Sequence, residues 1–228
     1  MTTPLPTWTE NLIGFDLETT GVDPDTARLV SAAVVDYENG QRVDGVEWRI
    51  DPGVEIPQEA SKVHGVWEAD RTGRQDHDTA VNEIVDELYD AWDAGYTIVV
   101  FNAPFDLTLL ANRARDAGRD FQIRGRVMDP LVVDRYLDKY RKGRRTLSAQ
   151  AEHYGVDLEN AHTAEADAEA AVEIALAVAA RWPQELADDT LMDRQRSWAN
   201  ENMEGLRAWL RKQGKSTADL RPGWPVRE

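Results

Sequence analysis

The stretch "FDLETTGVDP", residues 15–24, places two carboxylates, Asp16 and Glu18, at the end of an apolar run. Such a run is typical of a buried strand, and side chains two residues apart on a strand point to the same face. The stretch therefore predicts a buried strand over residues 10–17 that runs out into two acidic side chains projecting together.

Two later segments add further titratable residues. "FNAPFDLTLL" (101–110) puts Asp106 in the first turn of a helix that follows a second buried strand, and "AHTAEADAEAA" (161–171) puts His162 at the start and Asp167 in the second turn of an alanine-rich helix. Each acid alone also fits a solvated strand end or a favourable interaction with a helix dipole. Taken together, they fall at strand ends and helix N-termini, the rim of an α/β sheet where ligands bind.

Carboxylates gathered at one rim repel one another and hold protons unless a cation neutralises them. Because the candidate ligands are hard oxygens and the chain has no cysteine, the expected cation is Mg²⁺ or Mn²⁺. The lack of cysteine also excludes disulfides, thiolate catalysis and cysteine zinc sites. Two such ions about 4 Å apart are an established arrangement for phosphodiester hydrolysis.

The segments "FDLETTG", "NAPFD" and "AHTAEADA" resemble, in chain order, the three motifs of the DEDD exonuclease superfamily, over about residues 10–182. A histidine five residues before the last aspartate resembles the DEDDh branch, which includes the proofreading epsilon subunits of bacterial DNA polymerase III and their stand-alone relatives. One departure is Phe101, where many relatives have a histidine that is not a metal ligand.

The resemblance implies a role for each motif residue. Asp16, Glu18 and Asp167 would hold one metal ion, and Asp16 with Asp106 would hold a second. His162 would act as the general base, and Leu17 and Thr19 would line the terminal nucleotide.

The remaining pattern predicts the fold class. It is α/β: a ribonuclease H-like mixed five-stranded sheet flanked by helices, with a C-terminal helical extension. The strands are expected at residues 10–17, on both sides of the Asn39-Gly40 turn within 27–51, at 96–101 and within 125–131. The helices are expected at residues 78–95, 103–117 (with Asn102 as N-cap), after the strand within 125–131 as far as about 140, at 146–155 and at 163–182. Residues 1–182 are expected to form an exonuclease domain and residues 183–228 an extension with its own helix at about 193–213.

The formal net charge of −16 excludes generic electrostatic binding of nucleic acid, so any such contact must be local or metal-assisted. The basic segment "RKGRR" is the expected guide for the substrate backbone, through Arg141, Lys142, Arg144 and Arg145; the alternative is a solvated loop.

The extension carries three tryptophans, Trp198, Trp209 and Trp224. They are expected to pack on the core, and docking to a DNA polymerase partner is the alternative. There is no signal peptide or membrane-spanning stretch in the sequence, which predicts a cytoplasmic protein without a membrane partner.

The leading functional expectation is a metal-dependent 3′→5′ exonuclease acting on single-stranded DNA ends. An RNA exonuclease of the same superfamily is the second. A non-catalytic nucleic-acid binding module and a purely structural polymerase partner are the expectations from other classes.

Overall fold

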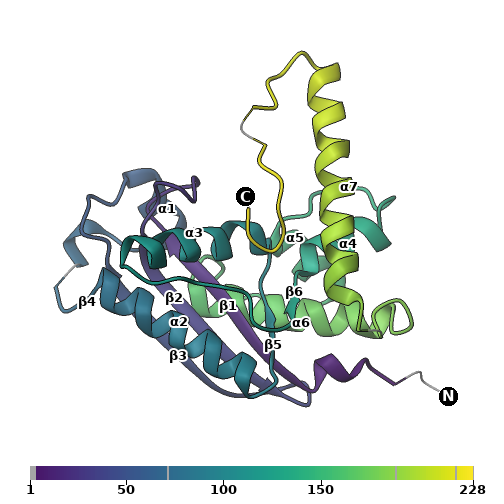
Figure 1. The fold of residues 1–228 in the computed structure, drawn as a ribbon, viewed down its shortest axis with the longest axis horizontal. Coiled ribbons are helices and arrows are strands. Elements are labelled where there is room, and N and C mark those ends of the chain that lie inside the picture. Colours follow the sequence, from purple (N-terminus) through teal and green to yellow (C-terminus); the bar gives the residue numbers. More distant parts are fainter. Residues whose placement is uncertain (1–3, 71, 188, 219, 228) are drawn as a thin grey trace.

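The computed structural model describes residues 4–70, 72–187, 189–218 and 220–227. One mixed sheet forms its centre, in the strand order β4-β3-β2-β1-β5-β6 (Figure 1). The strands, in chain order, are β1 (Asn11–Thr19), β2 (Leu29–Glu38), β3 (Gln41–Asp51), β4 (Gln75–Asp76), β5 (Thr97–Val99) and β6 (Val127–Met128). Strands β1, β2 and β3 pair antiparallel, whereas β5 and β6 continue from β1 in parallel.

The expected fold class is confirmed, with one strand more than expected. The extra strand, β4, is two residues long and pairs in parallel with the end of β3. Two residues are too few to produce a recognisable alternation of apolar and polar side chains. The expected hairpin is also confirmed, since Asn39 and Gly40 join β2 to β3 with φ values of 51° and 78°, as a tight two-residue turn requires.

The helices cover both faces of the sheet. They are α1 (Gln58–His64), α2 (His77–Asp93), α3 (Ala103–Asp116), α4 (Pro130–Leu137), α5 (Leu147–Tyr154), α6 (Ala164–Arg181) and α7 (Leu191–Lys212), with short 3-10 turns at Thr7–Thr9 and Glu68–Asp70. Helices α2 and α3 lie on one face and α6 on the other (Figure 1). Among the described residues, none of these helices has the length and hydrophobicity that a membrane span requires.

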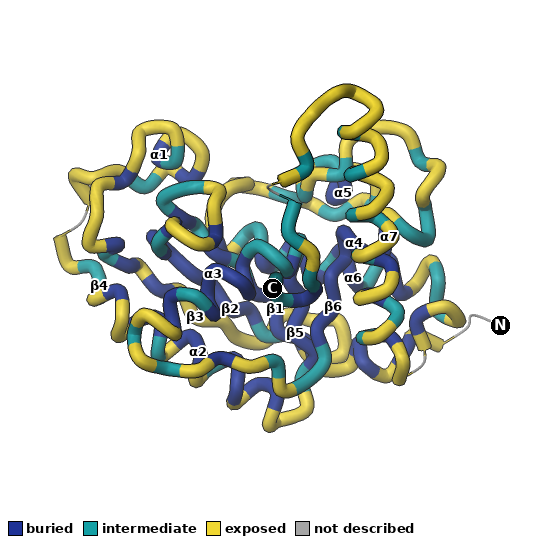
Figure 2. Tube along the Cα trace, turned by 45° about the horizontal axis from the view of Figure 1, so that its top comes forward, coloured by how far each residue is buried: buried dark blue, intermediate teal, exposed yellow. Residues whose placement is uncertain are grey.

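Burial follows this layered arrangement. Buried residues concentrate in the strands and in the helix faces turned toward them (Figure 2). Residues 12–15 of β1 are all buried, with no alternation, because helices cover the strand on both sides. The continuous apolar run before Asp16 therefore belongs to an inner strand of a sheet that is covered by helices on both faces.

Gly14 lets helix α6 approach the sheet closely. A Cβ atom on Gly14 would lie 2.5 Å from the Ala168 carbonyl oxygen and 2.8 Å from a methyl group of Val172. Only hydrogen at this position leaves room for the α6 backbone. The alanines of α6 thus serve the same purpose as the glycine: they bring the first turns of α6 against β1.

The C-terminal extension packs on the core through its first half. Trp198 stacks on Tyr136 of α4, with 4.7 Å between ring centroids. Gln195 is fully buried and bonds the edge of β6, accepting from Asp129 N at 2.8 Å and donating to the Val127 carbonyl at 2.8 Å. The second half of α7 projects away from the sheet (Figure 1). The division into two domains at residue 182 stays a prediction.

Two of the three tryptophans of the extension lie in the hydrophobic core. Trp198 and Trp224 are buried, whereas Trp209, on the projecting half of α7, is 52% exposed.

Candidate active site

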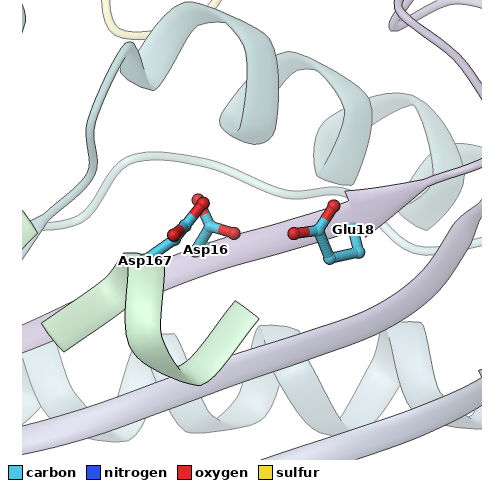
Figure 3. Close-up of side chains that lie close together, drawn as sticks. All are labelled: Asp16, Glu18 and Asp167. Atoms are coloured by element: carbon cyan, nitrogen blue, oxygen red, sulfur yellow. The ribbon is translucent and has the colours of Figure 1, made fainter. Parts of the chain in front are cut away.

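Three of the predicted acids meet at the end of β1. Asp16 and Glu18 project from the same strand, and Asp167 reaches them from α6 (Figure 3). Each offers a carboxylate oxygen within 4.8 Å of the others. Helix α6 begins at Ala164, so Asp167 lies in its first turn and not in its second as expected. The close approach at Gly14 brings this turn to the strand.

The end of β1 is irregular at this point. Asp16 pairs with Ala33 and Glu18 with Ser31, and the pairing then shifts between Glu18 and Thr19. Such a bulge bends the strand and ends its regular pairing. Thr19, which was expected to line the terminal nucleotide, donates its hydroxyl to the Gly21 carbonyl at 2.7 Å. Its side chain therefore holds the turn after the strand.

Asp106 lies in the first turn of α3 and is 4% exposed. The expected N-cap of α3, Asn102, occupies the cap position in the left-handed conformation, with φ 65°, but its side chain forms no cap hydrogen bond. The cap comes from another element: the carboxylate of Asp129 accepts from Asn102 N at 3.1 Å and from Ala103 N at 3.0 Å. A carboxylate satisfies these free N–H groups and complements the helix dipole.

Asp129 is fully buried and holds three parts of the chain together. It also caps α4 through Leu131 N and Val132 N and accepts from the indole nitrogen of Trp224 at 3.2 Å. Burial raises the pKa of Asp129 to about 6, and these hydrogen bonds act against that rise. Sequence reasoning missed Asp129, although an aspartate directly before a proline that opens a helix is an N-cap signal.

Every predicted metal ligand has a raised pKa. Burial raises the pKa of Asp16 well above its usual range, and the charges of Asp106, Glu18 and Asp167 add to the effect. Burial, with Asp167 and Asp106, raises the pKa of Glu18 to about 8. For Asp106, burial raises the pKa to about 8 against the backbone hydrogen bonds of Asp106 itself and Leu17.

Asp167 also has a raised pKa, through burial. The four acids therefore oppose one another's ionisation, and a divalent cation would reverse that. The donor set consists of three converging carboxylates with a fourth, buried one close enough to interact with them. It suits a hard cation such as Mg²⁺ or Mn²⁺.

His162 lies at the entrance of the same site. Its backbone N–H donates to Asp167 Oδ1 at 3.1 Å, and its φ of 71° is rare for a residue with a side chain. His162 is exposed. It lines the same cleft as Asp16 and Asp167, a hollow of about 400 Å³. The arrangement leaves the histidine beside the carboxylates and open to solvent.

The cleft has a mixed polar and apolar lining. Its lining residues are Asp16, Leu17, Glu18, Phe101, Asn102, Phe105, Asp106, Leu131, Arg135, Arg145, Thr146, Leu147, His162 and Asp167. It thus contains all five predicted catalytic residues and Leu17, but not Thr19.

The basic segment differs from the expectation. Arg141 forms a bidentate pair with Asp134, at 3.1 and 2.9 Å, and its side chain is 11% exposed. Arg145 lines the cleft, but its guanidinium bonds the Asp134 carboxylate and the Asp138 and Arg141 carbonyls. Both arginines compensate the charge of Asp134, which is fully buried. Lys142 and Arg144 are exposed, and neither lines the cleft.

A different arginine faces the cleft. Arg135 of α4 is exposed and lines the cleft, and no hydrogen bond or ion pair of its guanidinium is found among the described residues. Nothing in the sequence distinguished Arg135 from other helical arginines, because its position depends on how α4 packs.

Known proteins are similar to this chain in sequence. A model of the RNase_T exonuclease family matches residues 13–175. The chain is 31% identical to a DNA polymerase III subunit epsilon-like protein of Rhodobacter capsulatus, over 75% of this chain and 24% of that protein. It is 27% identical to a PolC-type DNA polymerase III of Clostridium perfringens, over 72% of this chain and 11% of that protein. The chain thus spans a quarter or less of the length of these two relatives.

Solved structures agree on the fold. The structure of E. coli exonuclease I in complex with a dT13 oligonucleotide superimposes with a TM-score of 0.70 at 19% identity, covering 83% of this chain and 45% of that one. Exonuclease I from Methylocaldum szegediense gives a TM-score of 0.65 at 21% identity, covering 85% and 45%. With the family model matching most of its length, the chain belongs to the RNase_T exonuclease family.

Proposed function

We propose that the chain is a metal-dependent 3′→5′ exonuclease that acts on single-stranded DNA and releases nucleoside 5′-monophosphates. The observation that carries the proposal is the convergence of Asp16, Glu18 and Asp167 within 4.8 Å, in a cleft that also contains Asp106 and His162. Family membership supports nuclease chemistry for this cleft.

The acids would hold two Mg²⁺ or Mn²⁺ ions. Asp16, Glu18 and Asp167 would hold the first, and Asp16 with Asp106 the second. When bound, the ions would polarise the scissile phosphate and stabilise the negative charge that develops on it. Burial of the four carboxylates strengthens their interaction with such ions, because charges interact more strongly where water is excluded.

His162 would act as the general base. Its exposure and its place beside Asp167 allow the imidazole to take the proton from an attacking water. The backbone hydrogen bond to Asp167 fixes the position of His162 relative to the acids. Leu17, also in the cleft lining, would contact the terminal nucleotide.

The names of the similar proteins favour DNA as the substrate. The exonuclease I structure contains a dT13 oligonucleotide, and the two relatives are named as DNA polymerase III proteins. These names also support a DNA polymerase as a possible partner. RNA hydrolysis by the same site is the second candidate, since both polymers carry the same phosphodiester group.

One assay tests the proposal. The full chain with Mn²⁺ should shorten a 5′-labelled single-stranded DNA oligomer stepwise from its 3′ end, and EDTA should abolish the reaction. A matched RNA oligomer separates the two substrates. Cutting of a circular single strand at a similar rate would contradict exonuclease action, and binding without hydrolysis of either polymer would favour a non-catalytic module.

A further inference from the structure

A second groove continues from the catalytic cleft toward the C-terminal extension. It has a volume of about 320 Å³ and lies between α4, α7 and residues 221–227. Asn102, Leu131 and Arg135 line both hollows, so the two adjoin. The remaining lining residues of the groove are Pro104, Val132, Ala199, Asn200, Asn202, Met203, Leu206, Arg221, Pro222, Gly223 and Arg227.

The charge of this groove is opposite to that of the cleft. Its lining contains three arginines and no acidic residue, in a protein with a formal net charge of −16. Arg221 forms an ion pair with Asp25 at 2.5 Å. In the part of the chain that the structure describes, the guanidinium groups of Arg135 and Arg227 have no hydrogen-bond or ion-pair partner. The groove therefore presents two cations that form no direct ion pair with a described carboxylate.

Both guanidinium groups are partly desolvated, although the Arg135 residue as a whole is exposed. Burial lowers the pKa of Arg135 and, together with Arg221, that of Arg227. The charges of Asp25, Asp23 and Asp106 act in the opposite direction on Arg227. The effect of Asp106 places this guanidinium within electrostatic range of the acids in the cleft. A partly desolvated guanidinium that forms no direct ion pair favours an anionic ligand, and Arg is well suited to phosphate oxygens.

The C-terminal segment that forms one wall of the groove is attached to the core at two residues, Trp224 and Arg227. Trp224 is buried and donates to Asp129 at 3.2 Å, and the backbone N–H of Arg227 donates to the Thr108 hydroxyl of α3 at 2.8 Å. Between the arginines lie apolar side chains, including Met203, Pro222 and Leu206, which is 42% exposed.

We infer that this groove binds the single DNA strand upstream of the scissile bond, with Arg135 and Arg227 contacting its phosphates and the apolar floor contacting its bases. The inference rests on the proposed function, since the cleft must hold the 3′ end. A single strand presents phosphates and bases, which a groove with cationic and apolar side chains can bind. The walls from α7 and residues 221–227 lie outside the region that the family model matches, so this part of the path is an addition to the family domain.

The test compares Arg135→Gln and Arg227→Gln with Arg211→Gln. Arg211 lies on α7, is exposed, and does not line the groove, so its variant removes the same charge from another face. Affinity is measured by fluorescence anisotropy in EDTA, with a 5′-labelled dinucleotide and with an oligomer of about twelve nucleotides, within the site sizes of single-strand binding proteins. Thermal melts establish that each variant is folded.

The expected result depends on length and on salt. Each groove variant should weaken binding of the longer oligomer by about fivefold, the scale of an exposed ion pair. The slope of log Kd against log salt should fall by about 0.7 per variant, as one phosphate contact to a single strand predicts. The dinucleotide should lose much less in Arg227→Gln, because Arg227 does not line the cleft, and Arg211→Gln should resemble the wild type.

Two results would overturn the inference. One is an unchanged affinity and salt slope for the longer oligomer in both groove variants. The other is an equal loss for dinucleotide and oligomer in Arg227→Gln, which would mean that Arg227 acts on the end of the strand and not on its upstream part. If the wild type hydrolysed no oligomer and the groove variants still bound the longer oligomer more weakly, the proposed function would fail. The groove would then stand as a binding surface.

Discussion

The catalytic cleft and the neighbouring groove share three residues but carry opposite charges. The cleft collects four carboxylates from β1, α3 and α6, elements whose positions are fixed by burial in the core. The groove collects arginines from α4 and the C-terminal segment, at the surface of the extension. In the proposed function the anionic cleft would hold metal, and the separate cationic groove would attract the polyanionic strand.

The largest expected effect lies in the cleft. Asp167→Asn should lower kcat by about 10²- to 10³-fold or more, the scale of losing one group that stabilises transition-state charge. Single-turnover hydrolysis of a labelled oligomer measures it. Glu165→Gln is the matched control, because Glu165 lies in the same turn of α6 but pairs with Arg42 outside the cleft. Equal rates in the two variants would mean that Asp167 has no role in catalysis.

The general base comes next. His162→Ala should lower kcat by about 10²-fold or more, as loss of general-base catalysis predicts, while the Mn²⁺ affinity measured by calorimetry changes little. His153→Ala is the control, since His153 lies on α5, near Asp138 and Arg181, and does not line the cleft. Turnover close to that of the wild type would exclude His162 from proton transfer.

Asp129 connects the two regions, so its loss should affect both. Asp129→Ala leaves five N–H donors, four of them buried, without their acceptor and should lower the free energy of unfolding by about 3 kcal/mol or more. Urea denaturation measures the change. Asp120, exposed in the loop after α3, provides a control variant, Asp120→Ala. A loss no larger than that of the control would mean that α3 and Trp224 do not depend on this carboxylate.

The pH dependence of stability distinguishes the cleft from the rest of this acidic protein. The pKa of Glu18 is about 8 in the fold against an ordinary value of 4.5. The folded state therefore keeps a proton that the unfolded chain releases. This contribution to stability is fully present below pH 4.5 and is lost as the pH rises to about 8. In EDTA the melting temperature should fall across this window.

Glu18→Gln removes that titration and should flatten the fall. Bound Mn²⁺ should flatten it too, because the cation stabilises the ionised carboxylates. The measurement is a series of melts of wild type and variant in EDTA and in Mn²⁺. Identical slopes in EDTA for wild type and variant would contradict the raised pKa of Glu18.

Much of the cleft followed from the sequence because local rules governed it. The alternation of side chains on a strand placed Asp16 and Glu18 on one face, and the start of an alanine-rich helix located Asp167 to within one turn. The order of the three motifs, through its resemblance to the DEDD exonucleases, predicted that these segments lie together. The Asn39-Gly40 turn and the helix boundaries also depended on nearby residues alone.

What the sequence did not reveal depends on packing between distant segments. "RKGRR" is basic, yet two of its arginines pair with Asp134, a buried residue of a preceding helix. Asp129, the residue directly after β6, caps α3. Arg135 faces the cleft only because of the position of α4. A charged residue in a sequence does not disclose which partner neutralises it.

The central claim is that the clustered acids form a metal site, and Asp16→Asn tests it most directly. The charges of Asp106, Glu18 and Asp167 all raise the pKa of Asp16. Replacing Asp16 with asparagine therefore relieves this repulsion and at the same time removes the proposed metal ligand. The measurement is four melting curves, of wild type and variant, each in EDTA and in Mn²⁺.

The account predicts that the variant melts at or above the wild type in EDTA. In Mn²⁺ the wild type should gain about 2.7 kcal/mol when the metal is at a hundred times its Kd, a shift of several degrees, and the variant should gain much less. Equal Mn²⁺ shifts in the two proteins would contradict the claim that Asp16 holds metal.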